Sequence, residues 1–243
     1  AHQVISMARN AENSKRTLLS AEAIDSTISA TLLFLIADRS ADAAEAASRL
    51  TVVNATSSMR SALILSIKDL AMGRLDSLLT REYPVDAMYS EVNVGRDSRE
   101  FAADLLFHEC ATAIKGLAAE AHGADYEFDL RNALDKVLDL SRATTESLPG
   151  LSGMVNYQYA GPHHLASLLL AMIEGVRSSM LARLATPEGA NVGEWDKWTI
   201  SQSKLRPFLW VNHQKAIQSG YLNRGNSMVM TSPTGSGKTT LSM

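Results

Sequence analysis

The chain has 243 residues, of which 46% are hydrophobic and 20% are charged, and its formal net charge is −3. It is long enough to bury one large hydrophobic core or two small ones. A single cysteine, Cys110, excludes an intramolecular disulfide framework and fits a reducing cytosol. The start at Ala1 has no signal-peptide pattern, and the longest apolar run, residues 28–37, is too short to span a bilayer. We therefore expect a soluble, cytoplasmic protein.

Charge is unevenly distributed along the chain. Residues 194–243 hold six basic and two acidic residues, a net charge of +4. Because the whole chain carries −3, residues 1–193 carry −7. An acidic surface attracts a phosphate backbone poorly. We therefore expect the N-terminal part to contact protein, and any nucleic acid to meet parts beyond residue 193.

The first third of the chain has the apolar spacing of helices. One or two helices are expected over residues 3–37, followed by a break at residues 38–42 in which Ser40 could cap the next helix. The pattern is helical again over residues 41–79. Its apolar stripe at spacings of three and four consists of Met59, Leu63, Ile67, Leu70, Ala71 and Leu78. Residues 81–97 are expected to form a loop.

Three further helices are expected over residues 98–122, 125–148 and 162–184. Gly123 stands where a C-terminal cap belongs, and Pro187 with Gly189 would end the third of these helices. No convincing strand pattern precedes residue 227. We therefore expect a mainly α protein, with a helical accessory domain of six to eight helices over residues 1–185. Residues 186–204 have the composition of a linker, and we expect Trp195 and Trp198 within it to contact a neighbouring domain.

The helical part offers no catalytic constellation. His108-Glu109-Cys110 lacks a second histidine at metal-binding spacing, so we interpret it as structural packing. His163 and His164 are adjacent and point about 100° apart on a helix, so they cannot share a metal by themselves. We place these two histidines near a helix start.

Residues 205–222 are expected to form a short amphipathic helix that precedes a glycine-rich stretch. His213 or Gln214 could hydrogen-bond an adenine edge while Phe208 or Trp210 stacks on the base. Near a phosphate-binding loop, this combination would read the base of a nucleotide.

The stretch from Ser227 to Met243 has the order strand, glycine turn, helix start that makes a P-loop. Two glycines allow consecutive backbone N–H groups to surround a phosphate, and the helix N-terminus adds partial positive charge. Lys238 is expected to bind the β- and γ-phosphates of ATP, and the Thr239 hydroxyl to ligate Mg²⁺. The expected phosphate-binding residues are Thr234, Gly235, Ser236, Gly237, Lys238, Thr239 and Thr240. Ser232 replaces the first glycine of the usual motif, and the alternative is a plain surface turn.

Only four residues follow Thr239, whereas a complete nucleoside triphosphatase needs a helix there and a carboxylate for Mg²⁺ further on. We therefore expect the chain to be the front part of a longer protein. By itself it is not expected to hydrolyse ATP.

The residues R-P-F-L-W-V-N-H-Q-K-A-I, followed later by P-T-G-S-G-K-T, resemble the opening of superfamily 2 helicases. In that family an adenine-reading Q motif precedes motif I, and the pattern here is most similar to Ski2-like DExH helicases. The resemblance covers residues 205–243 and implies a RecA-like α/β domain, with either His213 or Gln214 as the adenine contact. It also implies a DNA helicase or translocase whose nucleic acid is held by parts outside this chain. A helical domain before such a core looks like the helicase subunit of an antiphage defence system such as Hachiman.

Two other classes of protein remain open. The sequence T-G-S-G-K-T-T also occurs in secretion and pilus-retraction ATPases, which lack the upstream R-P-F-L-W-V-N-H-Q segment. The chain could also serve chiefly as an interaction domain whose acidic helices hold a partner subunit.

Overall fold

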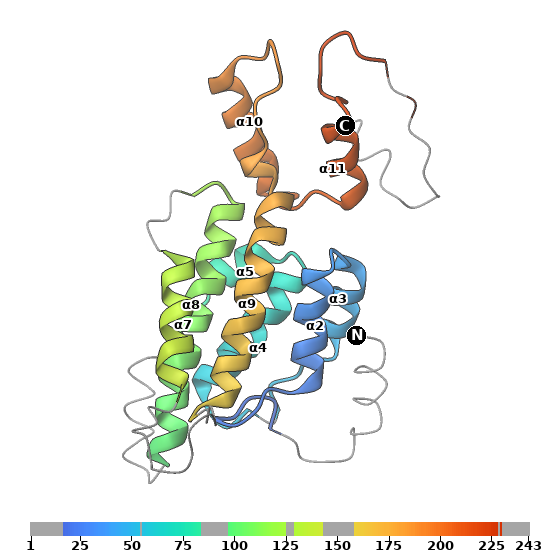
Figure 1. Cartoon of the computed structure of the whole chain (residues 1–243). Helices are drawn as coiled ribbons and strands as arrows, with labels where there is room; N and C mark the ends of the chain where they lie inside the picture. Colours follow the sequence, from blue (N-terminus) through green and yellow to red (C-terminus); the bar gives the residue numbers. More distant parts are fainter. Residues whose placement is uncertain are drawn as a thin grey trace, which may run out of the picture.

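The computed structural model describes residues 17–53, 55–83, 97–124, 129–142, 158–227 and 229, and this part of the chain is mainly helical. The predicted α class is therefore confirmed. Figure 1 shows the helices in their order along the chain. They are α2 (Ser26–Ile36), α3 (Ser40–Ser48), α4 (Ser58–Ala71), α5 (Leu75–Leu79), α7 (Ser98–Ala121), α8 (Leu130–Ser141), α9 (Ala160–Ser179), the 3₁₀ turn η1 (Leu181–Arg183), α10 (Val192–Ser203) and α11 (Val211–Gln218). In the described residues the only β-pairing consists of two isolated bridges, Leu19 with Ile24 and Met180 with Phe208.

Helices α2 to α9 pack into one bundle. The long helices α7 and α9 contact each other, α7 also packs against α4, and α9 also packs against α2 and α8. Figure 1 shows α10 and α11 projecting beyond one end of this bundle. The bundle is therefore the body of the structure, and the C-terminal helices extend from it.

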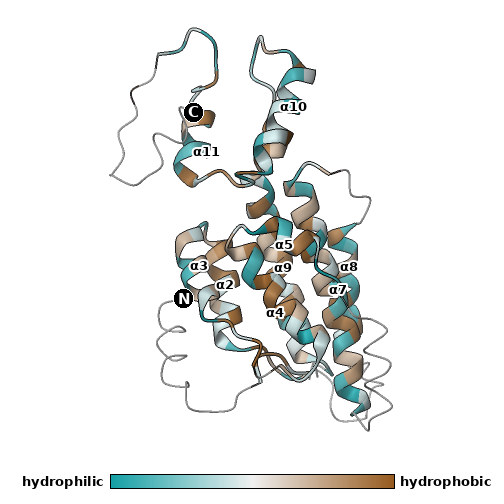
Figure 2. Cartoon of the chain, turned by 180° about the vertical axis from the view of Figure 1, so that it is seen from behind, coloured by the Kyte–Doolittle hydropathy of each residue, from teal (hydrophilic) through white to brown (hydrophobic). Residues whose placement is uncertain are grey.

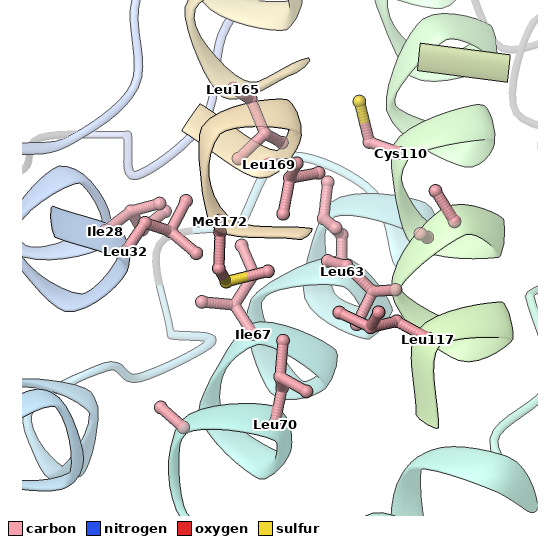
Figure 3. Packing of buried hydrophobic residues seen from close by; sticks show 14 of the residues in the cluster. Ile28, Leu32, Leu63, Ile67, Leu70, Cys110, Leu117, Leu165, Leu169 and Met172 are labelled. Carbon is pink, nitrogen blue, oxygen red and sulfur yellow. The ribbon is translucent and has the colours of Figure 1, made fainter. Parts of the chain in front are cut away.

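A single hydrophobic core runs through the bundle. Figure 3 shows side chains from α2, α4, α7 and α9 meeting at its centre. The labelled core residues are Ile28, Leu32, Leu63, Ile67, Leu70, Cys110, Leu117, Leu165, Leu169 and Met172. The stripe predicted between Met59 and Leu78 is buried throughout, which confirms the spacing argument. Every buried member of this core lies between Leu19 and Met180.

Several helix boundaries follow capping chemistry. The side chains of Asp25, Ser57, Asp97 and Asp129 each accept a hydrogen bond from a backbone N–H in the first turn of α2, α4, α7 and α8. Ser40 does not act as the predicted cap of α3, because it is already the first helical residue and Arg39 precedes it without a side-chain cap. The predicted C-terminal cap at Gly123 is confirmed by its φ of +72°.

Three of the predicted spans were too long. Residues 17–25 are not helical, because Leu19 pairs with Ile24 and the Asp25 side chain begins α2 only at Ser26. The predicted helix over residues 41–79 is three helices, separated at residues 49–57 and 72–74. In the third case α8 begins at Leu130, because its cap is Asp129. Apolar periodicity located the buried faces but not the interruptions between helices.

Two boundaries near the C-terminal end were also wrong. Helix α9 ends at Ser179, before Pro187, because Met180 has extended backbone and pairs with Phe208. Residues 192–203, which have the composition of a linker, form helix α10. The Asn191 side chain caps α10 by accepting a hydrogen bond from the Glu194 N–H.

The centre of the bundle contains one fully buried cation. The Arg60 side chain on α4 is 1% exposed, and its Nε donates to Asp104 Oδ1 on α7 at 2.6 Å. A second nitrogen, Nη2, pairs with the carboxylate of Glu100 and also donates to the Glu100 backbone oxygen at 3.1 Å. Burial of a charge is tolerated only with such compensation. This cluster therefore joins α4 to α7.

Arg60 also holds the segment before α2. Its Nη1 donates to the Leu19 backbone oxygen at 2.9 Å and to Thr56 Oγ1 at 2.9 Å. The same segment approaches α9 so closely that a Cβ on Gly161 would lie 2.1 Å from the Ser20 carbonyl oxygen. Only glycine fits at this contact, which places the N-terminal segment between α4 and α9.

We expect Arg60→Met to destabilise the fold by about 3–5 kcal/mol, because the Asp104 carboxylate would stay buried without its cation. Urea denaturation followed by circular dichroism measures this loss. Arg49→Ala is the matched control: its partner Glu45 is exposed, so the loss should stay below about 1 kcal/mol. Adding Asp104→Leu to Arg60→Met should recover part of the stability. Equal effects of Arg60→Met and Arg49→Ala would contradict the argument.

A shortened chain that ends at Ala185 should fold, because every buried core residue precedes this point. Phe208 is the one residue beyond Ala185 among the partly buried side chains that pack on the core. We expect a helical circular dichroism spectrum and a cooperative thermal transition. A molten or aggregated product would show that the C-terminal segment is needed for folding.

Candidate nucleotide site

The predicted phosphate-binding residues Thr234, Gly235, Ser236, Gly237, Lys238, Thr239 and Thr240 lie outside the described residues. Their roles, and the expected Mg²⁺ contact of Thr239, stay predictions. The structure does describe the segment that leads to them, as far as Ser227, together with Val229. The base-reading candidates Phe208, His213 and Gln214 belong to this segment.

The segment is fastened to the bundle before α11 begins. Phe208 forms an antiparallel bridge with Met180, directly after α9. The Leu181 N–H donates to the Pro207 oxygen at 2.9 Å, and the Leu209 N–H donates to the Ser179 oxygen at 2.6 Å. The Phe208 ring packs against the bundle core. The chain therefore leaves the bundle at α9, forms α10, and returns to the same point before α11.

Helix α11 starts immediately after this anchor. Trp210 has extended backbone, and its carbonyl oxygen accepts the N–H groups of His213 at 2.8 Å and Gln214 at 3.0 Å. The helix ends at Gln218, short of the predicted residue 222, and Gly220 just beyond its cap has a φ of +90°, which favours glycine. The Asn226 side chain then donates to the Gly220 oxygen at 3.3 Å and folds the chain back toward α11. Hydrogen bonds of the backbone and of the Asn226 side chain thus fix the first part of the segment that leads to the glycine-rich stretch.

His213 lies under a tryptophan. Its side chain is buried, and its ring stacks on Trp210 with 5.6 Å between ring centroids and 7° between ring planes. Trp210 itself is 48% exposed. Within this pair the indole is therefore the ring that solvent or a ligand can reach.

Gln214 is half-buried, and its amide is oriented. The Nε2 atom donates to the Leu209 backbone oxygen at 3.2 Å, which is the one hydrogen bond of this side chain within the described residues. A carboxamide has two N–H donors and one oxygen acceptor, so one donor and the acceptor can still serve a ligand. This is the pattern that an adenine N7 and N6 require.

The structure thus separates the four candidates of the sequence analysis. Phe208 packs on the bundle and His213 lies beneath Trp210, whereas Trp210 is exposed and Gln214 keeps an amide donor and acceptor. A planar ring next to a carboxamide can stack on a purine and hydrogen-bond its edge. Sequence spacing could not rank these residues, because it does not show which ring covers which.

The cysteine and the paired histidines singled out in the sequence lie within the helical bundle. Cys110 lies in the core as predicted, and burial, with the Glu109 charge as a smaller cause, raises the pKa of its thiol far above the ordinary value. His163 and His164 lie in the first turns of α9, and burial lowers the pKa of both imidazoles. His163 Nδ1 forms a 2.8 Å hydrogen bond with Ser141 Oγ. In the part of the chain that the structure describes, no group of three His, Cys, Asp or Glu side chains could hold a metal ion.

Within the described ranges, no helix is long and apolar enough to cross a membrane. Comparisons with protein-family models, with curated proteins and with solved structures find no match for this chain.

Cys110, the single cysteine, should not react with an aromatic disulfide reagent in the native protein at neutral pH. The raised pKa keeps the thiol protonated, and burial excludes the reagent. In increasing urea, one equivalent of thiol should react with the same midpoint as the loss of helical circular dichroism. Rapid labelling of the folded protein would contradict the packing assigned to α7.

Proposed function

We propose that residues 205–243 begin the RecA-like ATPase domain of a superfamily 2 helicase or translocase, and that residues 1–185 form its helical accessory domain. The observation that carries the proposal is the order of elements. An anchored helix with an oriented glutamine, α11, is followed along the chain by P-T-G-S-G-K-T. A base-reading helix ahead of a phosphate-binding loop is the order that the resemblance to superfamily 2 helicases implies.

In this proposal the loop residues bind the triphosphate. Backbone N–H groups from Thr234 to Thr240 surround the phosphates, Lys238 supplies a cation, and the Thr239 hydroxyl ligates Mg²⁺. Hydrolysis further needs a carboxylate for the metal and groups that act on the γ-phosphate, which the proposal assigns to the rest of the ATPase domain. DNA would be moved by that complete domain.

The base is read by Gln214, with Trp210 as the stacking ring. The hydrogen bond to Leu209 orients the Gln214 amide, which supports this residue over the buried His213. Phe208 then has a positioning role, because its bridge to Met180 sets where α11 starts. Base recognition is thereby connected to the end of α9.

The accessory domain is proposed to contact protein. Its described residues, within 17–185, carry 13 basic and 17 acidic side chains, a net charge of −4. Such a surface disfavours nucleic acid and suits a partner subunit, as in an antiphage defence complex. Both roles are compatible within one cytoplasmic protein.

Gln214→Ala should weaken ATP binding and narrow the preference for ATP over GTP. The guanine O6 acceptor mismatches an amide that pairs with adenine, and an unmatched buried polar pair costs roughly 1–3 kcal/mol, about ten- to a hundredfold in affinity. Competition of ATP and GTP for a fluorescent nucleotide, on the protein that carries the complete ATPase domain, measures both effects.

Lys238→Ala should weaken the binding of ATP and of GTP to the same extent, because the loop contacts the phosphates and not the base. Gln202→Ala is the matched control, because it removes a half-buried amide from α10 instead of α11. If Gln214→Ala leaves the base preference unchanged while Lys238→Ala abolishes binding, the chain belongs with P-loop ATPases of another class, such as the secretion type. If Lys238→Ala also has no effect, nucleotide binding itself is refuted.

A further inference from the structure

The described arginine side chains of the bundle are paired with carboxylates within the fold. Every described arginine from residue 17 to residue 183 has a carboxylate oxygen within 4.0 Å. These arginines are Arg39, Arg49, Arg60, Arg74, Arg81, Arg99, Arg131, Arg142, Arg177 and Arg183. A typical example is Arg177, which donates to both oxygens of Glu120 at 2.9 and 2.7 Å. Little positive charge is therefore left on the bundle for a ligand.

The α10–α11 region, residues 192–227, differs in this respect. It holds five basic side chains against the acidic Glu194 and Asp196, a net charge of +3. The five are Lys197, Lys204, Arg206, Lys215 and Arg224, and all are exposed. Among the described residues none of them forms an ion pair. The positive charge of this region is thus available to an anionic partner.

Two tryptophans of the same region are exposed yet held in place. Trp198 is 44% exposed and stacks on Trp195 at 5.0 Å with 29° between ring planes. The Trp195 indole N–H donates to the Leu184 oxygen at 3.0 Å, and this bond holds the Trp195 ring in place. Trp210 is held in the same way by its stack on His213. A base that stacks on either ring therefore meets an aromatic surface that is already ordered.

Charge and rings lie together on the projecting end of the molecule. Lys197 and Ser201 of α10 and its C-cap residue Lys204 are exposed. They are spaced by four and three residues, so they share one face, with Trp198 next to Lys197. Figure 1 shows α10 and α11 rising from the same end of the bundle. Chain positions 197 to 215 thus present lysines and indoles in alternation.

We propose that this α10–α11 surface binds single-stranded nucleic acid, with a base stacked on Trp198 and phosphates on Lys197, Lys204 and Arg206. Ordered aromatic rings beside unneutralised cations are the two components of a sequence-tolerant single-strand site. Stacking on an indole needs a base whose face is free, which selects single strands over duplex. This site goes beyond the proposed ATPase, since it uses no residue of the glycine-rich loop.

The distribution of apolar side chains argues against a membrane or an apolar protein groove as the partner. Trp198 and Ile200 are two positions apart, so they lie on nearly opposite sides of α10. Ile200 is directed at the bundle, where it contacts the position of Gly123. Figure 2 shows hydrophilic and hydrophobic residues mixed along α10.

Fluorescence anisotropy of a labelled oligothymidylate of about 16 nucleotides, with the whole 243-residue chain, tests the proposal. Binding should weaken as salt rises. Lys197→Ala with Lys204→Ala should reduce the slope of log K against log salt by about 1.4, about 0.7 for each lost phosphate contact. Trp198→Ala should weaken binding by about ten- to a hundredfold, and Trp198→Phe should retain most of the affinity because it keeps a ring.

One matched variant should leave binding unchanged: Lys136→Ala removes an exposed lysine from α8 of the acidic bundle. Circular dichroism of each variant checks the fold. The proposal is overturned if the chain shows no salt-dependent binding, if Lys136→Ala weakens binding as much as the Lys197 and Lys204 variants, or if the chain binds vesicles of anionic phospholipid but not the oligonucleotide.

Discussion

The fold depends on how it compensates one guanidinium in its core. Arg60 would cost several kcal/mol to bury alone, so α4 can sit at the centre only when Asp104 and Glu100 of α7 face it. The same side chain binds the Leu19 carbonyl and thereby recruits the segment before α2. Apolar burial supplies the larger energy, but it is non-directional. The directional bonds of Arg60 therefore hold α4, α7 and the segment before α2 in place relative to one another.

The second constraint is the return of the chain to the end of α9. Two backbone hydrogen bonds, from Leu181 to Pro207 and from Leu209 to Ser179, close the excursion that contains α10. They set the start of α11, and with it the positions of Trp210 and Gln214. A nucleotide bound near α11 would be in mechanical connection with the bundle through Phe208, whose ring packs on the core. The bundle and the candidate site are in this way parts of one structure.

The distribution of charge also differs between the bundle and the α10–α11 region. In the bundle the described arginines are paired with carboxylates, which leaves a net negative charge. In the α10–α11 region the lysines and arginines remain available beside exposed indoles. Both kinds of surface are made from similar residues, and they differ because ion pairing in the bundle joins helices that are far apart in sequence, such as α7 and α9 through Glu120 and Arg177.

The sequence by itself determined the helical class, the apolar stripe from Met59 to Leu78, the cap at Gly123 and the core position of Cys110, because these follow from local periodicity and backbone preference. It also supplied the P-loop hypothesis, which rests on residues outside the described part. The tertiary structure decided what depends on long-range contacts. The end of α9 at Ser179 follows from the bridge to Phe208, and the helix over residues 192–203 replaced an expected linker. The choice of Gln214 over His213 required knowing that Trp210 covers the histidine, a contact between rings that residue spacing alone does not specify.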